Sequence, residues 1–96
     1  MSALTKLARG RACQVRLPGI CNFNAETTVL AHYRLAGICG VGFKPPDLIG
    51  AHCCSACHDA IDGRVPSGLS EDELNLAHAH GVFRTQVIVI KLGKLK

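Results

Sequence analysis

The order of apolar and polar positions along this chain predicts short elements separated by turns. Residues 2–10 predict a short helical turn that ends at Gly10. The segment 27–35 is rich in β-branched and aromatic residues, which is typical of a strand, and 48–53 forms a second short segment. Residues 53–62 predict a turn that opens into a helix. We therefore expect a small α+β fold.

Glycine and proline mark the segments between these elements. Residues 13–21 predict two short extended pieces around a turn at Pro18 and Gly19. Residues 36–50 contain four glycines and two prolines and predict a loop, and long loops in small domains are usually functional or disordered. A further loop is expected over 63–68.

The C-terminal third predicts a long helix. Ser70 and Glu73 have the spacing of a capping box, and two further acidic residues favour the same helix N-terminus. This helix is expected to reach at least His80, and Gly81 is a candidate interruption. The apolar run 87–90 fits a strand as well as a buried helix, and we favour the helix.

Length and composition limit the hydrophobic core. The 96 residues are too few for two cores, so we expect one domain over 1–96. A chain of this size buries only about 60–65% of its unfolded surface. It has one Tyr, three Phe and no Trp, but six Cys. Small domains of this kind usually need disulfides or a structural metal.

The net charge of +4 is concentrated at the two ends. Residues 1–16 and 84–96 each carry four basic and no acidic residues, whereas 17–83 carries three basic and seven acidic ones. Basic ends fit a polyanion such as DNA, but they are also typical of solvated termini. Neither a secretory signal nor an apolar run of roughly 18 residues is visible, so we expect a cytoplasmic protein without membrane contact.

In a reducing compartment, the cysteine spacing favours a metal over disulfides. Cys54 and Cys57 have the C-x2-C spacing of a zinc knuckle. Cys13 and Cys21 can supply two more thiolates and complete a tetrahedral site. These four residues are therefore the predicted ligands of a structural Zn²⁺.

Other interpretations of the cysteines stay open. Cys53 can replace Cys54, although C-x3-C fits a knuckle less well, and Cys39 is left as a spare thiol. Disulfides are one alternative. A covalent haem at the C-x2-C-H sequence of 54–58 is another, but an axial Met is lacking because the only methionine is Met1.

His58 and Asp62 are four residues apart and share one face of the helix that they open. Such a pair is half of a shell for Mg²⁺ or Mn²⁺, although a histidine beside a zinc site explains it equally well. For the other polar residues we expect simpler environments: a half-buried His32, a solvated Asp59, surface positions for His78 and His80, and a His52 that flanks the knuckle.

Five segments carry a family resemblance: CQVRLPGIC (13–21), ETTVLAHYRL (26–35), KPPDLIG (44–50), CSACHDAID (54–62) and RTQVIVIK (84–91). Two cysteines, a strand histidine, a loop and a C-x2-C-H sequence that opens a helix follow in the order that resembles the HNH (ββα-metal) nucleases in a zinc-stapled, treble-clef-like form. More closely, the segments are similar to the YbcO family, small proteins of lambdoid prophages that are classed as nucleases. The resemblance implies core motifs over 8–62 and a C-terminal helical extension over 69–96.

The resemblance also implies a function. It implies a metal-dependent DNA endonuclease that hydrolyses phosphodiester bonds, with recombination or branched DNA of a prophage as a candidate substrate. His32 would be the general base, and His58 a ligand of a catalytic Mg²⁺ or Mn²⁺ with Asp62 as its companion. Arg34 can hold a phosphate oxygen. Asp47 is the nearest substitute for the middle Asn of the pattern.

A non-catalytic zinc module that binds DNA or a protein is the alternative. Ala31 favours it, because many relatives of this pattern carry a metal-binding Asp or His just before the base. The absence of any Asn between Tyr33 and Cys53 favours it too. A homodimer is a further candidate assembly, since nucleases that cut both strands often work as dimers.

Overall fold

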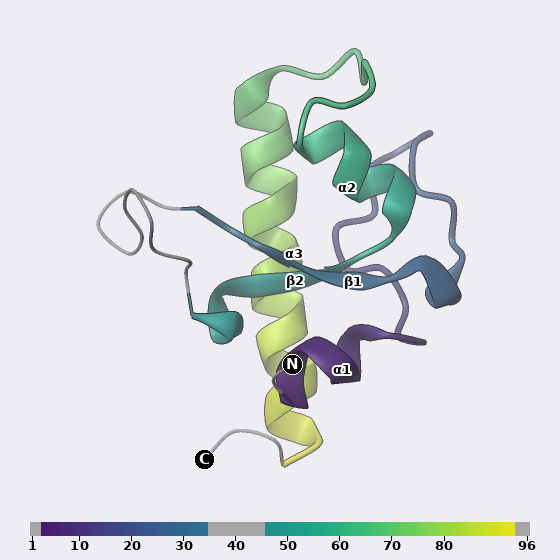
Figure 1. Cartoon of the computed structure of the whole chain (residues 1–96). Coiled ribbons are helices and arrows are strands. Elements are labelled where there is room, and N and C mark those ends of the chain that lie inside the picture. The colour runs from purple at the N-terminus through teal and green to yellow at the C-terminus, as the bar shows by residue number, and fades with distance from the viewer. Residues whose placement is uncertain (1–2, 35–45, 94–96) are drawn as a thin grey trace.

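A computed structural model describes residues 3–34 and 46–93 of the chain (Figure 1). Strands β1 (Val29–His32) and β2 (Gly50–Cys53) pair antiparallel, with Val29 opposite Cys53 and His32 opposite Gly50. The fold is α+β, as the sequence predicts. Its helices and strands, in chain order, are α1 (Ala3–Ala8), β1 (Val29–His32), β2 (Gly50–Cys53), α2 (Ser55–Ile61) and α3 (Glu71–Lys91).

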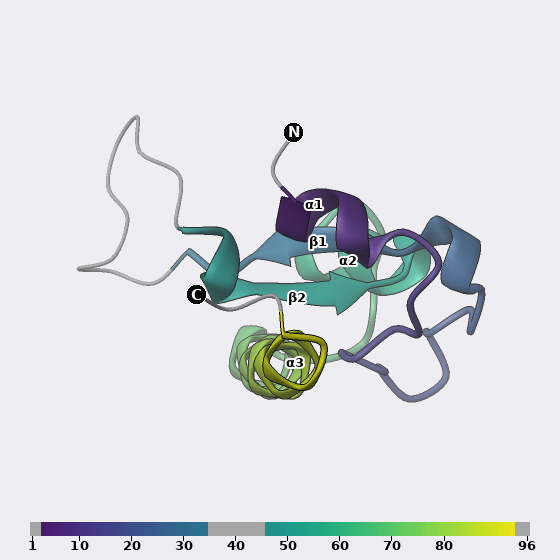
Figure 2. The same cartoon turned by 90° about the horizontal axis from the view of Figure 1, so that it is seen from below.

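The two strands form a layer between helices. Figure 2 shows α1 over one face of the strand pair and α3 across the other. The backbone N–H of His52 in β2 donates to Oγ1 of Thr85 in α3 at 2.9 Å. The C-terminal helix therefore completes the core. No helix in the described ranges is long and apolar enough to cross a membrane.

Helix α3 passes through Gly81 without interruption. The predicted capping box of Ser70 and Glu73 is present at its start. A Cβ at position 81 would lie 2.8 Å from Cγ2 of Val15 and 3.2 Å from Cβ of Ala51. Gly81 thus lets the helix lie directly against β2, and this packing outweighs the roughly 1 kcal/mol by which glycine disfavours a helix.

Replacing Gly81 with alanine should therefore destabilise the protein, by about 1–3 kcal/mol, because the added methyl group overpacks rigid neighbours. Urea denaturation of the zinc-loaded protein measures the effect, with His80→Ala on the exposed side of the helix as the control. A Gly81→Ala chain as stable as wild type would show that the helix does not approach β2 this closely.

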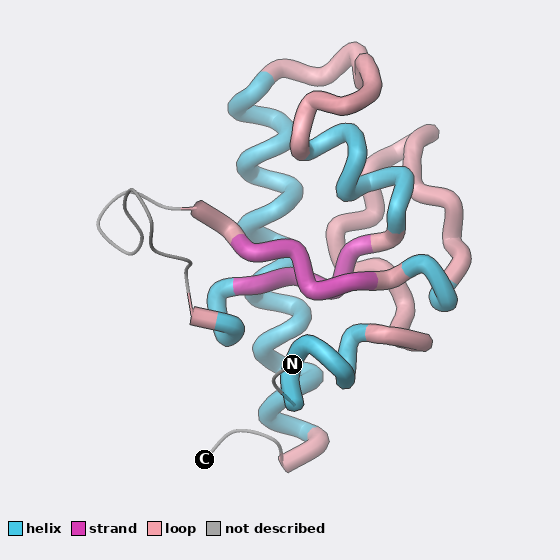
Figure 3. The backbone as a smooth tube through the Cα atoms, in the orientation of Figure 1, coloured by secondary structure: helices cyan, strands magenta, loops and turns pink. Residues whose placement is uncertain are grey.

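The segment between α1 and β1 differs from the prediction. It contains turns and no strand, so the two expected extended pieces over 13–21 are wrong (Figure 3). The predicted turn is present: the N–H of Ile20 donates to the carbonyl of Leu17 at 3.1 Å, and Gly19 has a φ of 71°. Arg16 and Phe23 also have positive φ. The turn and these positive-φ residues fold the segment back on itself, so that Cys13 and Cys21 lie close together.

The strand predicted over 27–35 is shorter than expected. A 3₁₀ turn occupies Ala25–Thr27, β1 ends at His32, and Arg34 follows the strand. The helix predicted near the N-terminus is α1, and the helix after Cys54 is α2. Cys39 and most of the predicted loop lie outside the described residues.

Candidate metal centre and catalytic cavity

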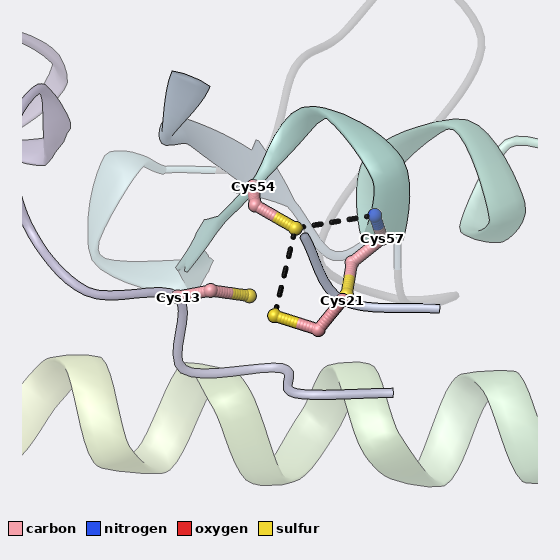
Figure 4. Close-up of side chains that lie close together, drawn as sticks. All are labelled: Cys13, Cys21, Cys54 and Cys57. Atoms are coloured by element: carbon pink, nitrogen blue, oxygen red, sulfur yellow. Dashed lines mark hydrogen bonds between the residues drawn. The ribbon is translucent and has the colours of Figure 1, made fainter. Parts of the chain in front are cut away.

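The structure brings together the four predicted cysteines, Cys13, Cys21, Cys54 and Cys57 (Figure 4). All four are buried, and their Sγ atoms lie within 4.8 Å of one another. The Sγ atoms of Cys21 and Cys54 are 3.7 Å apart. In a tetrahedral site with Zn–S bonds of about 2.3 Å, neighbouring sulfurs are about 3.8 Å apart. The group could therefore hold a metal such as zinc.

Backbone N–H groups point at the sulfurs. Cys54 is the N-cap of α2, and its Sγ accepts the N–H of Cys57 at 3.4 Å. The N–H of Arg16 donates to Sγ of Cys13 at 3.4 Å, and the N–H of Leu17 donates to Sγ of Cys57 at 3.4 Å. Donors aimed at sulfur stabilise thiolates, which are the form that binds metal. The surroundings of the cluster thus suit metal ligands.

The thiols also influence one another's ionisation. Hydrogen bonds from Cys53 and Cys57 hold the pKa of Cys13 far below its usual value. The pKa of Cys57 is raised, chiefly by its bond to Cys13, and burial raises the pKa of Cys21. Without a cation, Cys13 is therefore favoured as the thiolate, and Cys21 and Cys57 as protonated thiols. A divalent cation would replace those protons, and this donor set fits Zn²⁺.

Cys53 is buried beside this cluster but is not part of the group of four. It lies in β2 and belongs to the hydrophobic core, and its pKa is raised, chiefly by its bond to Cys13. A protonated Cys53 acts as a small apolar residue that donates a hydrogen bond. The choice of Cys54 in the predicted set agrees with this geometry.

His32 meets Asp47 at the end of the sheet. The Nε2 atom of His32 lies 2.7 Å from Oδ1 of Asp47. Antiparallel pairing brings them together, because His32 lies opposite Gly50 and the 3₁₀ turn Asp47–Ile49 precedes that residue. An ionised carboxylate only accepts hydrogen bonds, so Nε2 carries the hydrogen of this bond. When the ring is neutral, its lone pair is then on Nδ1.

A cavity of about 170 Å³ opens beside His32, and we call it the His32 cavity. It joins the end of β1 to α2 and to the first half of α3. Arg34 lies on its wall although it follows the strand. The cavity therefore brings together two imidazoles, a carboxylate, a guanidinium and an amide. Its lining residues are His32, Tyr33, Arg34, Ile61, Asp62, Asn75 and His78.

His58 and Asp62 lie one turn apart on α2, as predicted, and contact each other. The Nε2 atom of His58 is 3.2 Å from Oδ2 of Asp62. Arg64 pairs with the same carboxylate at 3.1 Å and with Asp59 at 2.9 Å. Asp59 is thus half-buried and paired with a cation. Within the described ranges, no third acidic, histidine or cysteine side chain joins His58 and Asp62 to form a larger cluster.

The two lining residues that α3 contributes, Asn75 and His78, are missing from the sequence prediction of the site. His78 is buried, so its predicted surface position is wrong. Its Nε2–H donates to the carbonyl of Ala31 at 2.9 Å, and its ring centre is 5.0 Å from that of Tyr33. Burial lowers the pKa of His78, which keeps the ring neutral. Asn75 and His78 are three residues apart, so the helical period is the signal that could have paired them.

The two strands also explain where the side chains of His52 and Ala31 lie. His52, expected beside the knuckle, is buried in β2, and burial lowers its pKa. Ala31 is also buried, and alternation along β1 puts its side chain on the opposite face from His32. A ligand at position 31 would therefore point into the core of this protein, away from the His32 cavity.

Comparison with known proteins identifies the family. Residues 2–94 match the family model described as "Putative nuclease YbcO". The chain belongs to the YbcO family. The protein named "Putative nuclease YbcO" of Escherichia coli (strain K12) is 54% identical over 99 residues, which cover 100% of this chain and 99% of the relative. "Putative nuclease ybcO" of Enterobacteria phage 82 has the same identity and coverage.

A solved structure shares the fold of this chain. It is titled "Structure of a putative bacteriophage protein from Escherichia coli str. K-12 substr. MG1655". It has a TM-score of 0.80 and 49% sequence identity, and the alignment covers 94% of this chain and 99% of the other. The predicted YbcO resemblance is confirmed, and the relatives connect the chain to bacteriophage proteins and to nuclease activity in general.

Proposed function

We propose that this YbcO protein is an HNH-type, metal-dependent DNA endonuclease that hydrolyses phosphodiester bonds in the His32 cavity. The observation that carries the proposal is the 2.7 Å hydrogen bond between Asp47 and His32, which lines the cavity together with Arg34. The family name supports nuclease activity, and the phage relatives make recombination or branched DNA the first substrate to test.

In this proposal His32 is the general base. Its Nε2–H donates to Asp47, so Nδ1 takes a proton from a water molecule. The water oxygen bonds to phosphorus as the bond from phosphorus to the leaving oxygen breaks, and the leaving oxygen takes a proton from solvent. The carboxylate of Asp47 stabilises the imidazolium and fixes the ring, as the acid does in other histidine–carboxylate pairs.

The remaining polar groups of the cavity would bind the phosphate. The Arg34 guanidinium can hold two oxygens at once, and the Asn75 amide can donate to a third. Farther along the surface, Lys6 and Arg9 line a second cavity of about 420 Å³ beside β1. These two cations are suitable contacts for neighbouring phosphates of the DNA backbone.

His58 and Asp62 would hold the catalytic Mg²⁺ or Mn²⁺. Magnesium is commonly held by one or two protein ligands together with water and substrate phosphates, so two donors fit. Such an ion polarises the phosphate and stabilises charge on the leaving oxygen. The order of β1 with His32, then β2, then α2 with His58 supports a ββα-metal arrangement.

A non-catalytic zinc module that binds DNA or a protein is the second candidate. The observation that favours it is the contact between His58 and Asp62, which pair with each other and, through Asp62, with Arg64. In that case the four cysteines would hold the fold and the basic residues would bind a partner, without cleavage.

Nicking of supercoiled plasmid separates the two candidates. With Mg²⁺ or Mn²⁺ we expect the nicked form to accumulate, and with EDTA we expect the rate to fall at least about a hundredfold, because charge on the leaving oxygen loses its counterion. Zinc content is measured in the same samples, so that loss of the structural ion is detected. A four-way junction and a duplex of equal length compare substrates. Retained DNA binding without metal-dependent nicking would favour the binding module.

A further inference from the structure

Helix α3 has an exposed apolar stripe on its outer side. Leu76, Phe83, Val87 and Ile90 are each between 50% and 63% exposed. The buried residues of this helix lie on the other side, where it packs against β2 (Figure 2). We call Leu76, His80, Phe83, Val87 and Ile90 the outer stripe. A helix with apolar residues on two opposite sides is typical of a helix packed on both.

The spacing of the outer stripe is that of a helix pair. Positions 76, 80, 83, 87 and 90 are separated by four, three, four and three residues. This is the alternation of the a and d positions of a coiled coil, sustained over two heptads. Only His80 in the stripe is polar, and a polar residue at one such position sets the register. The pattern therefore fits another helix better than it fits a flat surface.

We propose that the outer stripe docks on α3 of a second copy of this chain, with the two helices antiparallel. The charges at the two ends of α3 favour a second copy of this helix as the partner, and they favour the antiparallel orientation. The first turn of α3 carries Glu71, Asp72 and Glu73, and its last turn carries Lys91. An antiparallel pair places each acidic end beside the basic end of the partner. A parallel pair would place like charges together.

The expected contact is small and reversible. A 21-residue helix is about 31 Å long, so a single helix pair buries an area at the low end of specific interfaces. Dissociation constants on the order of 10 μM suit such a contact. A two-fold pair also buries the same stripe on both copies, which leaves no apolar surface for further association.

Sedimentation velocity of the zinc-loaded full chain tests the pairing, from about 1 μM to about 200 μM. The mass should rise from 10.2 kDa towards twice that value. Phe83→Glu should keep the chain monomeric. Phe23→Glu is the matched control, because Phe23 is 83% exposed and lies outside α3. A wild-type chain that stays monomeric, or an equal loss of dimer in both variants, would overturn the proposal. Zinc content and circular dichroism confirm that each variant is folded.

Charge reversal tests the direction. In the antiparallel pair, Lys91→Glu places two acidic groups side by side at both ends and should weaken association about tenfold. Adding Asp72→Lys to the Lys91→Glu variant should restore association of the two copies. If Lys91→Glu leaves the dissociation constant unchanged, the helices are not antiparallel. None of these measurements uses DNA cleavage, so their outcome is independent of the proposed nuclease activity.

Discussion

Replacing Cys57 with serine should eliminate zinc binding and unfold most of the protein at 37 °C. The core explains this expectation, because its buried side chains are mainly cysteines, alanines and valines, which bury little apolar surface. Structural zinc contributes about 10–16 kcal/mol of apparent binding free energy in small modules, whereas typical net stabilities are about 5–15 kcal/mol. The variant also leaves three crowded thiols and a hydroxyl in a buried site.

Zinc content per chain and thermal unfolding followed by circular dichroism measure this effect. Wild type should contain one zinc per chain. Cys53→Ala is the matched control, because Cys53 is buried beside the cluster but lies outside the group of four. It should keep the zinc and lose about 1–3 kcal/mol of stability to the small cavity. A Cys57→Ser chain with one zinc and wild-type melting would show that the cluster does not hold the fold together.

Replacing His32 with alanine should slow DNA nicking by about 10²–10⁴-fold, the usual contribution of a general base. The substitution removes the atom that takes the proton from water, and it leaves the cysteine cluster and α3 intact. Asp47→Asn keeps a hydrogen-bond acceptor for Nε2 but removes the charge that stabilises the imidazolium, so its rate should lie between those of wild type and His32→Ala.

The matched control for His32 is His80→Ala, since His80 is an exposed histidine on α3 that lies away from the His32 cavity. The rate of loss of supercoiled plasmid is measured for each chain at equal zinc content. Equal rates in the His32 and His80 variants would refute a specific role for His32.

Local spacing explains what could be predicted. The C-x2-C pair at the start of α2, the capping box at Ser70 and the turn at Gly19 each depend on residues a few positions apart. Short-range geometry determines such features, so they can be inferred from sequence. Spacing alone does not assign Cys13 and Cys21 to the same cluster as Cys54 and Cys57. That assignment also depends on the four ligands of a tetrahedral zinc site.

Contacts between distant segments explain what was missed. The His32–Asp47 bond spans 15 residues and depends on the strand register. His78 looked like a surface residue because the sequence did not reveal that α3 packs across β2. Gly81 looked like an interruption for the same reason, although it makes that packing close. The position of Asn75 on the cavity wall follows from the same docking of α3.

The nicking rate of His32→Ala divided by that of wild type tests the central claim most directly. Both chains are compared at equal zinc content and at DNA concentrations where gel shift shows equal occupancy, so neither folding nor binding enters the ratio. We predict a ratio below about 0.01, because the base is lost while the scaffold and the DNA contacts remain. A ratio near one would contradict catalysis by His32.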